Sequence, residues 1–503
     1  MATSQRKLNP YAGSYVWLKQ KKSSGRSPAA RRFLDRTELY REAATEFWNS
    51  AWFFPCLFVI AGAFLLLKQG IAGALTMTII LCMMLLFCED ILSALFPFLL
   101  LFLVTIDNFS DFRVFFRFWW AAVALVGCFV LHLYLYAKPL RKGKSFRGWA
   151  LVSAATILSG IGVMAGRDYL TVVSLYYSLG LGVGMFALYL VLKSQIVPDG
   201  SGKQLRRFAA VLYATGLFTG FVILRYYGEY LGWFLEHLTV GNFSYRNYCS
   251  TILLMAMPIP CYFSLKKGKH LAGFLFLYIC TILAGSRSGM LFGTLLAALN
   301  IVYLFRFDSK RRKQYALAIA ILTIPVIAIS YQFIGRLFSA RLAGGILGDQ
   351  DAVRFTFLLQ ALKDFANSPI FGAGLGNRTN RGIFEGVYGS MIWYHNWFAQ
   401  VLGSMGIVGV LAYGVQLADR LHILKEKWSP ETAALSLSFF GIFLMSMTNP
   451  GEFCPLPNEF LVMAMFVLIE DSSVKQPEYS VPLLRGVSVG SPAALQSHAS
   501  RMR

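Results

Sequence analysis

AWFFPCLFVIAGAFLLL, residues 51–67, is an uninterrupted apolar run near the start of the chain. A transmembrane helix needs about 20 mostly apolar residues, and runs of this kind recur along the sequence. Because they do not alternate between apolar and polar residues, they predict membrane-spanning helices and exclude a β-barrel. We expect residues 51–67 to act as an uncleaved membrane anchor.

The composition of the chain agrees with an integral membrane protein. Of 503 residues, 56% are hydrophobic and 14% are charged, whereas soluble domains carry about 25% charged residues. The predicted fold class is all-α, a polytopic transmembrane helical bundle with about 12–14 spans. The spans are predicted near residues 51–67, 71–88, 91–107, 116–137, 148–166, 170–192, 208–227, 248–265, 271–285, 288–305, 315–334, 396–418, 432–448 and 457–470.

Lys and Arg predict the orientation, because they concentrate in inner loops. With both chain ends inside, 34 of the 47 Lys and Arg face the cytoplasm. The net charge of +22 then faces the anionic lipids of the inner leaflet. No folded basic domain is available for nucleic acid, so we exclude that class of partner. The tails, residues 1–50 and about 471–503, are expected to be mobile.

The eight cysteines indicate neither a structural metal site nor a disulfide framework. Seven of them lie in or beside predicted spans, and only Cys454 is in an outer loop. Without CxxC pairs or a cluster of ligands, they are expected to be buried as small hydrophobic residues.

One long polar interruption, residues 335–394, is predicted to lie on the outer face. Apolar positions between Asp351 and Phe365 have helical spacing, which predicts an amphipathic helix against the bilayer or the bundle. The glycine run from Pro369 to Gly376 follows this helix. It lacks the preceding strand and following helix of a nucleotide-binding loop, so we exclude nucleotide binding.

Three arginines and one histidine on the outer side are candidates for chemistry. Arg246 precedes a span, Arg287 lies between two closely linked spans, and Arg354 is in the long loop. Such arginines act as interface anchors or bind anions through paired donors. His395 begins a span, where the helix dipole favours a neutral histidine that can act as a base. The alternative is that His395 is a histidine at the membrane interface without a catalytic role.

These residues together resemble the O-antigen ligase and polymerase superfamily. The resemblance covers residues 205–450 and is most specific in the last of its motifs. The motifs are Tyr245-Arg246-Asn247, Ser286-Arg287-Ser288-Gly289, the loop arginine Arg354, Pro369 to Asn377, and the run from His395-Asn396-Trp397-Phe398 through Gln400 and Gly403 to Gly409. The chain then divides into a basic tail (1–50), N-terminal spans (51–200), the ligase-like core (205–450), a last span (451–470) and a tail (471–503).

The resemblance implies a bundle like that of GT-C membrane glycosyltransferases, in the bacterial inner membrane. Its donor would be a glycan on undecaprenyl diphosphate, its acceptor a glycan, lipid or protein, and its mechanism free of metal and cofactor. It implies that His395 is the general base and that Arg246 and Arg354 contact the diphosphate, with Arg287 as a further candidate. Asn247 and Asn396 are expected to support them.

Two alternatives stay open at this point. A ligase transfers a finished chain, whereas a polymerase extends a repeat unit, and both need the same donor site. The rival from another class is a secondary transporter, which would need broken helices and ionisable residues at the membrane midplane.

Overall fold

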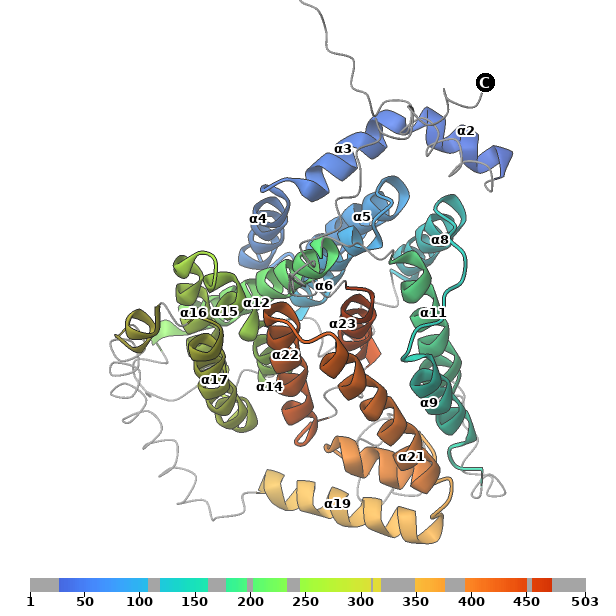
Figure 1. The fold of residues 1–503 in the computed structure, drawn as a ribbon, viewed down its shortest axis with the longest axis vertical. Helices are drawn as coiled ribbons and strands as arrows, with labels where there is room; N and C mark the ends of the chain where they lie inside the picture. The colour runs from blue at the N-terminus through green and yellow to red at the C-terminus, as the bar shows by residue number, and fades with distance from the viewer. Residues whose placement is uncertain are drawn as a thin grey trace, which may run out of the picture.

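The computed structural model describes the helical parts of the chain and the turns that connect them. The described residues are 27–106, 118–161, 178–196, 202–232, 245–308, 311–317, 349–375, 394–449 and 455–472. Within these ranges the elements are helices packed side by side, without strands (Figure 1). The predicted all-α, polytopic membrane fold is therefore confirmed.

The first half of the bundle contains eight labelled helices. They are α2 (Pro28–Arg36), α3 (Glu38–Asn49), α4 (Phe53–Leu66), α5 (Gly70–Phe87), α6 (Leu95–Val104), α8 (Trp119–Leu135), α9 (Phe146–Leu158) and α11 (Met185–Gln195). A 3₁₀ turn, Ile91–Ala94, leads into α6, and a π-helical segment, Ser178–Gly184, leads into α11.

The second half contains the candidate site. Its helices are α12 (Lys203–Glu229), α14 (Arg246–Ala256), α15 (Pro258–Ser264), α16 (Leu271–Leu283), α17 (Arg287–Phe307), α19 (Asp349–Asn367), α21 (Trp397–Glu426), α22 (Pro430–Ser446) and α23 (Phe460–Asp471). Every predicted span corresponds to a described helix except residues 315–334, most of which lie outside the described residues.

Five described helices are long and apolar enough to cross a membrane alone, or six if α3 and α4 form one span bent by 88°. Several other predicted spans are shorter because the chain breaks within them. The span near 248–265 divides at Pro258, whose ring cannot supply the N–H that a continuing helix needs. The count of 12–14 spans stays a prediction.

The prediction of a mobile N-terminal tail is wrong for residues 28–49, which form α2 and α3. Ser27 caps α2, because its Oγ accepts a hydrogen bond of 3.2 Å from the Ala30 N–H. Ala30 and Leu34 then pack against Leu135 and Tyr136 of the α8 region. The apolar residues among the charges give α2 one face that can be buried, which composition alone does not reveal.

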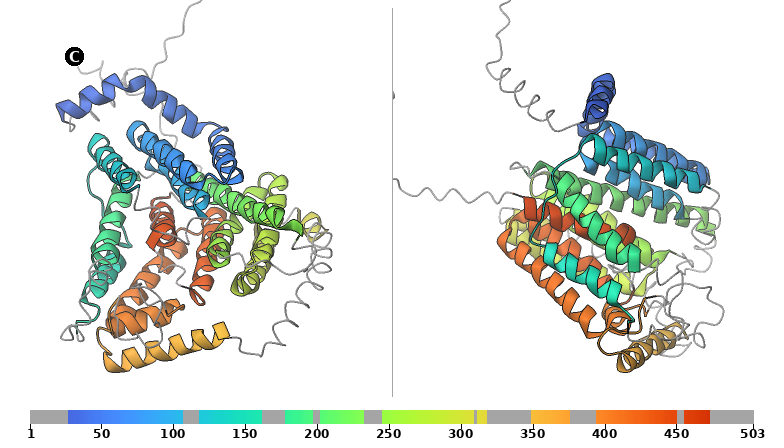
Figure 2. Two further views of the ribbon diagram at one scale, coloured as in Figure 1. Left: turned by 180° about the vertical axis from the view of Figure 1, so that it is seen from behind. Right: turned by 90° about the vertical axis from the view of Figure 1, so that its right-hand side faces the viewer.

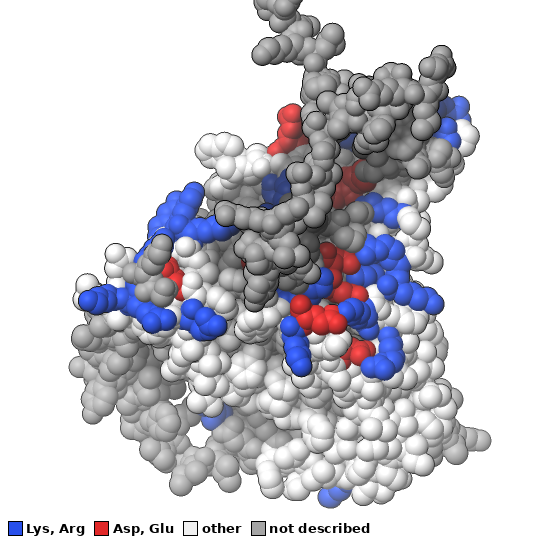
Figure 3. All heavy atoms as spheres, in the orientation of Figure 1, with Lys and Arg blue, Asp and Glu red and all other residues white. Residues whose placement is uncertain are grey.

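A network of ion pairs joins the ends of several helices on one face. Lys193 is buried, and its Nζ lies 2.7 Å from Asp471 Oδ1 and 3.1 Å from Glu470 Oε2. Arg141 Nη2 lies 2.9 Å from the same Asp471 oxygen, and Arg147 Nη2 lies 2.8 Å from Asp419 Oδ1. Figure 3 shows blue and red side chains interspersed over this face. The network brings the loop at 138–147 and the ends of α11, α21 and α23 together, as the predicted topology requires.

Candidate functional site

Helix α21 is broken near its start. Gly406 has φ 62° and ψ −155°, a combination that only glycine adopts readily, and Figure 1 shows α21 running in two directions. A Cβ on Gly406 would lie 2.6 Å from the carbonyl oxygens of both Pro369 and Ile370. The predicted span at 396–418 is thus a short first segment followed by a long second one.

The backbone of the long loop, residues 335–394, fills this break with its described part. The segment from Pro369 to Gly374 pairs with the carbonyl and N–H groups that the break releases from α21. The four hydrogen bonds are Ala373 N to Gly403 O (2.8 Å), Gly374 N to Ser404 O (2.8 Å), Ile407 N to Pro369 O (2.9 Å) and Val408 N to Ile370 O (3.2 Å). Because an unpaired backbone group at membrane depth costs several kcal/mol, the glycine run of the loop serves to complete α21.

The predicted amphipathic helix of the loop is present as α19, and it packs against the bundle. Figures 1 and 2 show it along the edge opposite α2 and α3. A Cβ on Gly403 would approach Ala361 of α19 to 3.1 Å, so the missing side chain allows close packing. Phe357 and Ala361 form a small buried cluster with Tyr394 and Ala399. The loop helix therefore lies directly on the first segment of α21.

A buried polar pair fastens α19 to the residue before His395. The Tyr394 hydroxyl donates a short hydrogen bond to Asp364 Oδ2, and both side chains are buried. Gln360 Nε2 donates to the other Asp364 oxygen at 2.9 Å. Burial, and then the charge of Asp364, raise the pKa of Tyr394 well above its ordinary value. The phenol therefore stays protonated and remains a hydrogen-bond donor.

His395 sits in a constrained turn at the start of α21. Its φ is 53°, in the left-handed region where histidine is more frequent than most residues. Its ring stacks on Phe357 of α19, with centroids 5.4 Å apart and planes at 24°. Asn396 then caps α21, because its Oδ1 accepts from the Ala399 N–H at 2.9 Å. The cap, the turn and α19 together fix the position of the imidazole.

Hydrogen bonds connect this turn to the starts of two other helices. Asn396 Nδ2 donates to the Met447 carbonyl at the end of α22, at 2.7 Å. Two residues later, Asn449 Oδ1 accepts from Asn247 Nδ2 of α14 at 3.0 Å. Asn247 Oδ1 in turn accepts from Ser286 Oγ, the cap of α17, at 2.7 Å. The N-termini of α14, α17 and α21 therefore converge on the end of α22.

This convergence brings three of the predicted site residues to one end of the bundle. Arg246 is the first residue of α14 and is half-buried, Arg287 is the first residue of α17 and is exposed, and His395 precedes α21. Asn247 and Asn396, predicted as supporting residues, are the side chains that link them. Helix N-termini carry partial positive charge, so this end of the bundle combines helix dipoles and guanidinium groups suited to an anion.

Arg354 is placed only in part. Its backbone belongs to α19, one helical turn before Phe357, the residue that stacks on His395. Its side chain lies outside the described residues, and so does the whole of His237, the other histidine that the sequence places on the predicted outer side. The predicted contact between Arg354 and a diphosphate therefore stays a prediction.

Several residues of this site were not predicted as candidates from the sequence. Asn449 and Ser286 complete the link between helices, and Asp364 and Tyr394 hold α19. For Asp364 a signal existed: it follows Ala361 by three residues and Phe357 by seven, so a charge stands on the apolar face. Nothing comparable distinguishes Asn449, whose partner is about 200 residues away in the sequence.

The absence of a metal from the mechanism is an implication of the resemblance alone. Asp349 and Asp351, at the start of α19, have the Asp-x-Asp spacing of a metal-binding pair, and their side chains lie outside the described residues. Metal dependence is therefore decided by experiment, with a chelator.

Comparison with known protein families gives a match to the part of the chain that contains this site. The family model described as O-antigen ligase matches residues 272–414, which contain Arg287, α19 and His395, whereas Arg246 precedes the match. The curated proteins contain no match to the chain. The family match confirms that this chain, a multi-pass helical membrane protein, resembles the O-antigen ligase and polymerase superfamily over the residues that carry Arg287 and His395.

Proposed function

We propose that this protein is a membrane glycosyltransferase that moves a glycan from undecaprenyl diphosphate to an acceptor hydroxyl. The site would face the outside of the bacterial cytoplasmic membrane, with both chain ends in the cytoplasm. The O-antigen ligase match supports a membrane glycan ligase or polymerase in general. The observation that carries the finer proposal is the hydrogen-bonded convergence of the starts of α14, α17 and α21.

The arginines and helix ends have an electrostatic role in this proposal. Cleavage of a sugar–diphosphate bond develops negative charge on the leaving diphosphate. Arg246 and Arg354 would bind that group through paired donors, and Arg287 would add charge at the edge of the site. Groups that are already fixed by the fold stabilise such charge without reorganising during the reaction.

His395 would act as the general base. The acceptor oxygen attacks the anomeric carbon, the bond from that carbon to the diphosphate oxygen breaks, and the hydroxyl proton passes to His395. Direct displacement of this kind inverts the anomeric configuration. A positioned base contributes about 10²–10⁴-fold to such a reaction, and the turn, the Asn396 cap and Phe357 hold the imidazole in place.

Ligase and polymerase differ only in the acceptor, which is a glycan, lipid or protein in one case and a lipid-linked repeat unit in the other. The transporter alternative would use the break in α21, because exposed backbone groups at a broken helix bind substrates and ions. Here those groups are paired with the backbone of Pro369 to Gly374. That pairing favours a transferase.

The direct test is glycan transfer from purified lipid-linked donor by the full-length protein. His395→Ala should lower transfer by about 10²-fold or more, at unchanged protein level, while lipid-linked donor accumulates in cells. His237→Ala is the matched control on the predicted outer side and should retain activity. All assays are run with and without chelator.

Equal activity of the two histidine variants would remove His395 as the base. Loss of wild-type activity in chelator alone would replace the metal-free mechanism and direct attention to Asp349 and Asp351. Net uptake of substrate into vesicles without any transfer product would favour the transporter.

A further inference from the structure

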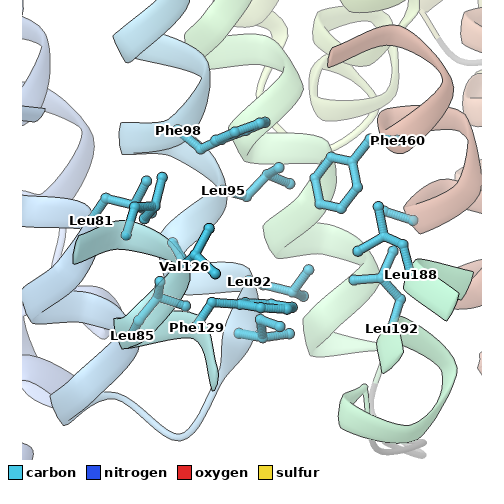
Figure 4. A pocket seen from close by; sticks show the side chains of 14 residues that line it. Leu81, Leu85, Leu92, Leu95, Phe98, Val126, Phe129, Leu188, Leu192 and Phe460 are labelled. Atoms are coloured by element: carbon cyan, nitrogen blue, oxygen red, sulfur yellow. The ribbon is translucent and has the colours of Figure 1, made fainter. Parts of the chain in front are cut away.

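Two cavities of opposite character lie next to each other in the N-terminal half, away from the candidate site. The first, of about 330 Å³, is lined only by apolar side chains from α5, α6, α8, α11 and α23. Figure 4 shows these side chains, among them Leu85, Leu92, Phe129 and Leu192, directed into one space. Its wall includes Val126 of α8, whose side chain is 61% exposed, so the cavity borders the surface that faces lipid.

The second cavity, of about 610 Å³, has charged and polar side chains in its wall as well as apolar ones, and we call it the polar cavity. Four basic residues line it, Arg41, Lys138, Lys203 and Arg207, together with the acidic Glu89 and Asp90. The formal charge of the wall is therefore positive. It lies between α3, the end of α5 and the start of α12, on the side predicted to face the cytoplasm.

The two cavities share no lining residue, but three chain segments contribute to both, so they lie close together. On α11, Leu192 faces the apolar cavity and Gln195 the polar one, a separation of about 4.5 Å along the helix axis. At the end of α5, Leu85 lines the apolar cavity and Cys88 lines the polar one. Before α6, Leu92 lines the apolar cavity and Asp90 the polar one. A molecule with an apolar part and a charged part could occupy both spaces at once.

Two side chains that line the polar cavity each carry a buried polar atom with unmet hydrogen-bonding capacity. Gln195 is 5% exposed, and its Oε1 has no hydrogen-bond partner among the described residues. Arg41 lies over the Tyr136 ring, 5.7 Å from its centre, and its buried Nε also lacks a partner there. Buried groups of this kind are nearly always satisfied, so a ligand with an acceptor beside Arg41 and a donor beside Gln195 would meet this capacity.

We propose that this pair of cavities binds one anionic phospholipid of the inner leaflet. A hydrocarbon chain occupies the apolar cavity, which water does not fill readily. The phosphate lies beside Arg41, and a headgroup hydroxyl donates to Gln195 Oε1. Both cavities are within the range of small-molecule sites, about 300–1,000 Å³.

The chain's own tails fit this space poorly. Residues 1–26 contain six Lys or Arg and no Asp or Glu, and residues 473–503 contain four basic residues and one acidic residue. A positively charged cavity repels both segments, whereas it attracts a phosphate. A soluble phosphate would leave the adjoining apolar cavity unoccupied.

The first experiment is thermal unfolding of the full-length protein after delipidation in detergent. The ligands are phosphatidylglycerol, zwitterionic phosphatidylcholine and glycerol 3-phosphate. Phosphatidylglycerol should raise the melting temperature of the wild type clearly more than phosphatidylcholine, and glycerol 3-phosphate should have no effect. Arg41→Gln should abolish the preference for phosphatidylglycerol, and Leu188→Trp, which fills the apolar cavity, should abolish the response to both lipids.

Matched controls are Lys267→Gln, in an exposed loop predicted to be inside, and Leu291→Trp, on the exposed surface of α17. Both should respond as the wild type does. Unchanged responses of Arg41→Gln and Leu188→Trp would overturn the proposal. An equal response to glycerol 3-phosphate would show a site for a soluble anion instead.

The second experiment uses only the wild type, so it does not depend on how a variant folds. Phosphatidylglycerol with a photoreactive acyl chain should label peptides that contain Leu92, Phe129 or Leu192. Labelling spread evenly over peptides of the outer helix surfaces, such as the one with Leu291, would contradict a defined site. Neither experiment measures glycan transfer, so the lipid site and the proposed function can fail separately.

Discussion

The Tyr394 hydroxyl donates a buried hydrogen bond to the Asp364 carboxylate. This bond joins α19 to the turn at His395. Removing the hydroxyl takes one hydrogen-bond donor away from the Asp364 carboxylate, which is buried and also accepts from Gln360. A buried polar group without its partner costs about 1–3 kcal/mol, and more when it is charged. The loop helix would then loosen from the turn that carries the candidate base.

We therefore expect Tyr394→Phe to lower transfer by roughly 10–100-fold, because small misplacements of a reacting group have effects of this size. The defect should be mainly in kcat, since the donor-binding arginines are unchanged. Tyr278→Phe is the control, because it also removes one hydroxyl that bonds a side chain, Thr294, at 3.2 Å on the α16–α17 surface. Steady-state transfer kinetics with matched protein levels distinguish the two. A Tyr394→Phe enzyme with normal kcat would contradict the positioning role.

The arginines allow a test of geometry as distinct from charge. Lys retains the charge of Arg but not its planar fork, so Arg246→Lys and Arg354→Lys should both weaken donor use by about 10-fold or more. Arg225→Lys is the control. Arg225 lies near the end of α12, and its guanidinium forms an ion pair with Glu229 at 3.2 Å. Titration of lipid-linked donor at constant acceptor gives the KM of each variant. Normal donor KM in both site variants would leave these arginines as interface anchors.

Residue types in short motifs were sufficient to name Arg246, Arg287 and His395 as candidates, because an arginine or histidine at the start of an apolar segment is conspicuous. No signal in the sequence pointed to Asn449, and the one for Asp364, a charge on the apolar face of its helix, did not reveal its role. Their roles depend on partners that only the folded chain brings near, Asn247 for one and Tyr394 for the other.

Among the elements, α21 contains two glycines that differ in whether a side chain could be added at their position. Gly406 has positive φ, and a Cβ there would meet two carbonyl oxygens at 2.6 Å. Gly414, in the same helix, has no atom within 4 Å of such a Cβ. Gly406→Ala should destabilise the protein by about 1–3 kcal/mol from backbone strain alone, with further loss from the displaced loop. Gly414→Ala should be neutral or slightly stabilising.

Melting temperature and yield in detergent measure this difference directly. Similar stability of the two alanine variants would show that the backbone near 406 relaxes without losing its contacts with Pro369 and Ile370.

Apolar run length was enough to predict where most helices lie, because hydrocarbon imposes helical structure on any such segment. The break in α21 could not be predicted, since Gly403, Gly406 and Gly409 recur every three residues, a spacing that keeps them close together on the surface of a continuous helix. What distinguishes Gly406 is the loop backbone beside it, at Pro369 and Ile370, which the sequence places 37 and 36 residues earlier. Helices α2 and α3 were missed because their charge obscured their apolar face.

For the whole molecule, the distribution of Lys and Arg predicts the orientation in the membrane, and cysteine labelling measures it. Single cysteines introduced into residues 335–394 should react with an impermeant reagent in intact cells. Cysteines placed between residues 138 and 147 should react only after lysis. The native cysteines of the described residues lie in helices or at their ends, and they are first replaced to lower the background.

Arg141 and Lys193 form ion pairs with Asp471 at the end of α23, so residues 138–147 lie on the same face as that helix end. The cysteines placed between residues 138 and 147 therefore serve as the internal standard. Labelling of the 335–394 sites only after lysis, with the 138–147 sites accessible, would reverse the orientation. The site would then face the cytoplasm, and the proposed donor chemistry would have to be reconsidered.

The exchange of backbone hydrogen bonds between the loop and α21 has a consequence for chimeric proteins. A loop transplanted from a relative is normally treated as a detachable module, but this one supplies four bonds inside another element. A graft of residues 349–375 without residues 394–410 would mismatch donor and acceptor at the break. The two segments should therefore be exchangeable only as a unit, and acceptor specificity should be inherited with both of them together.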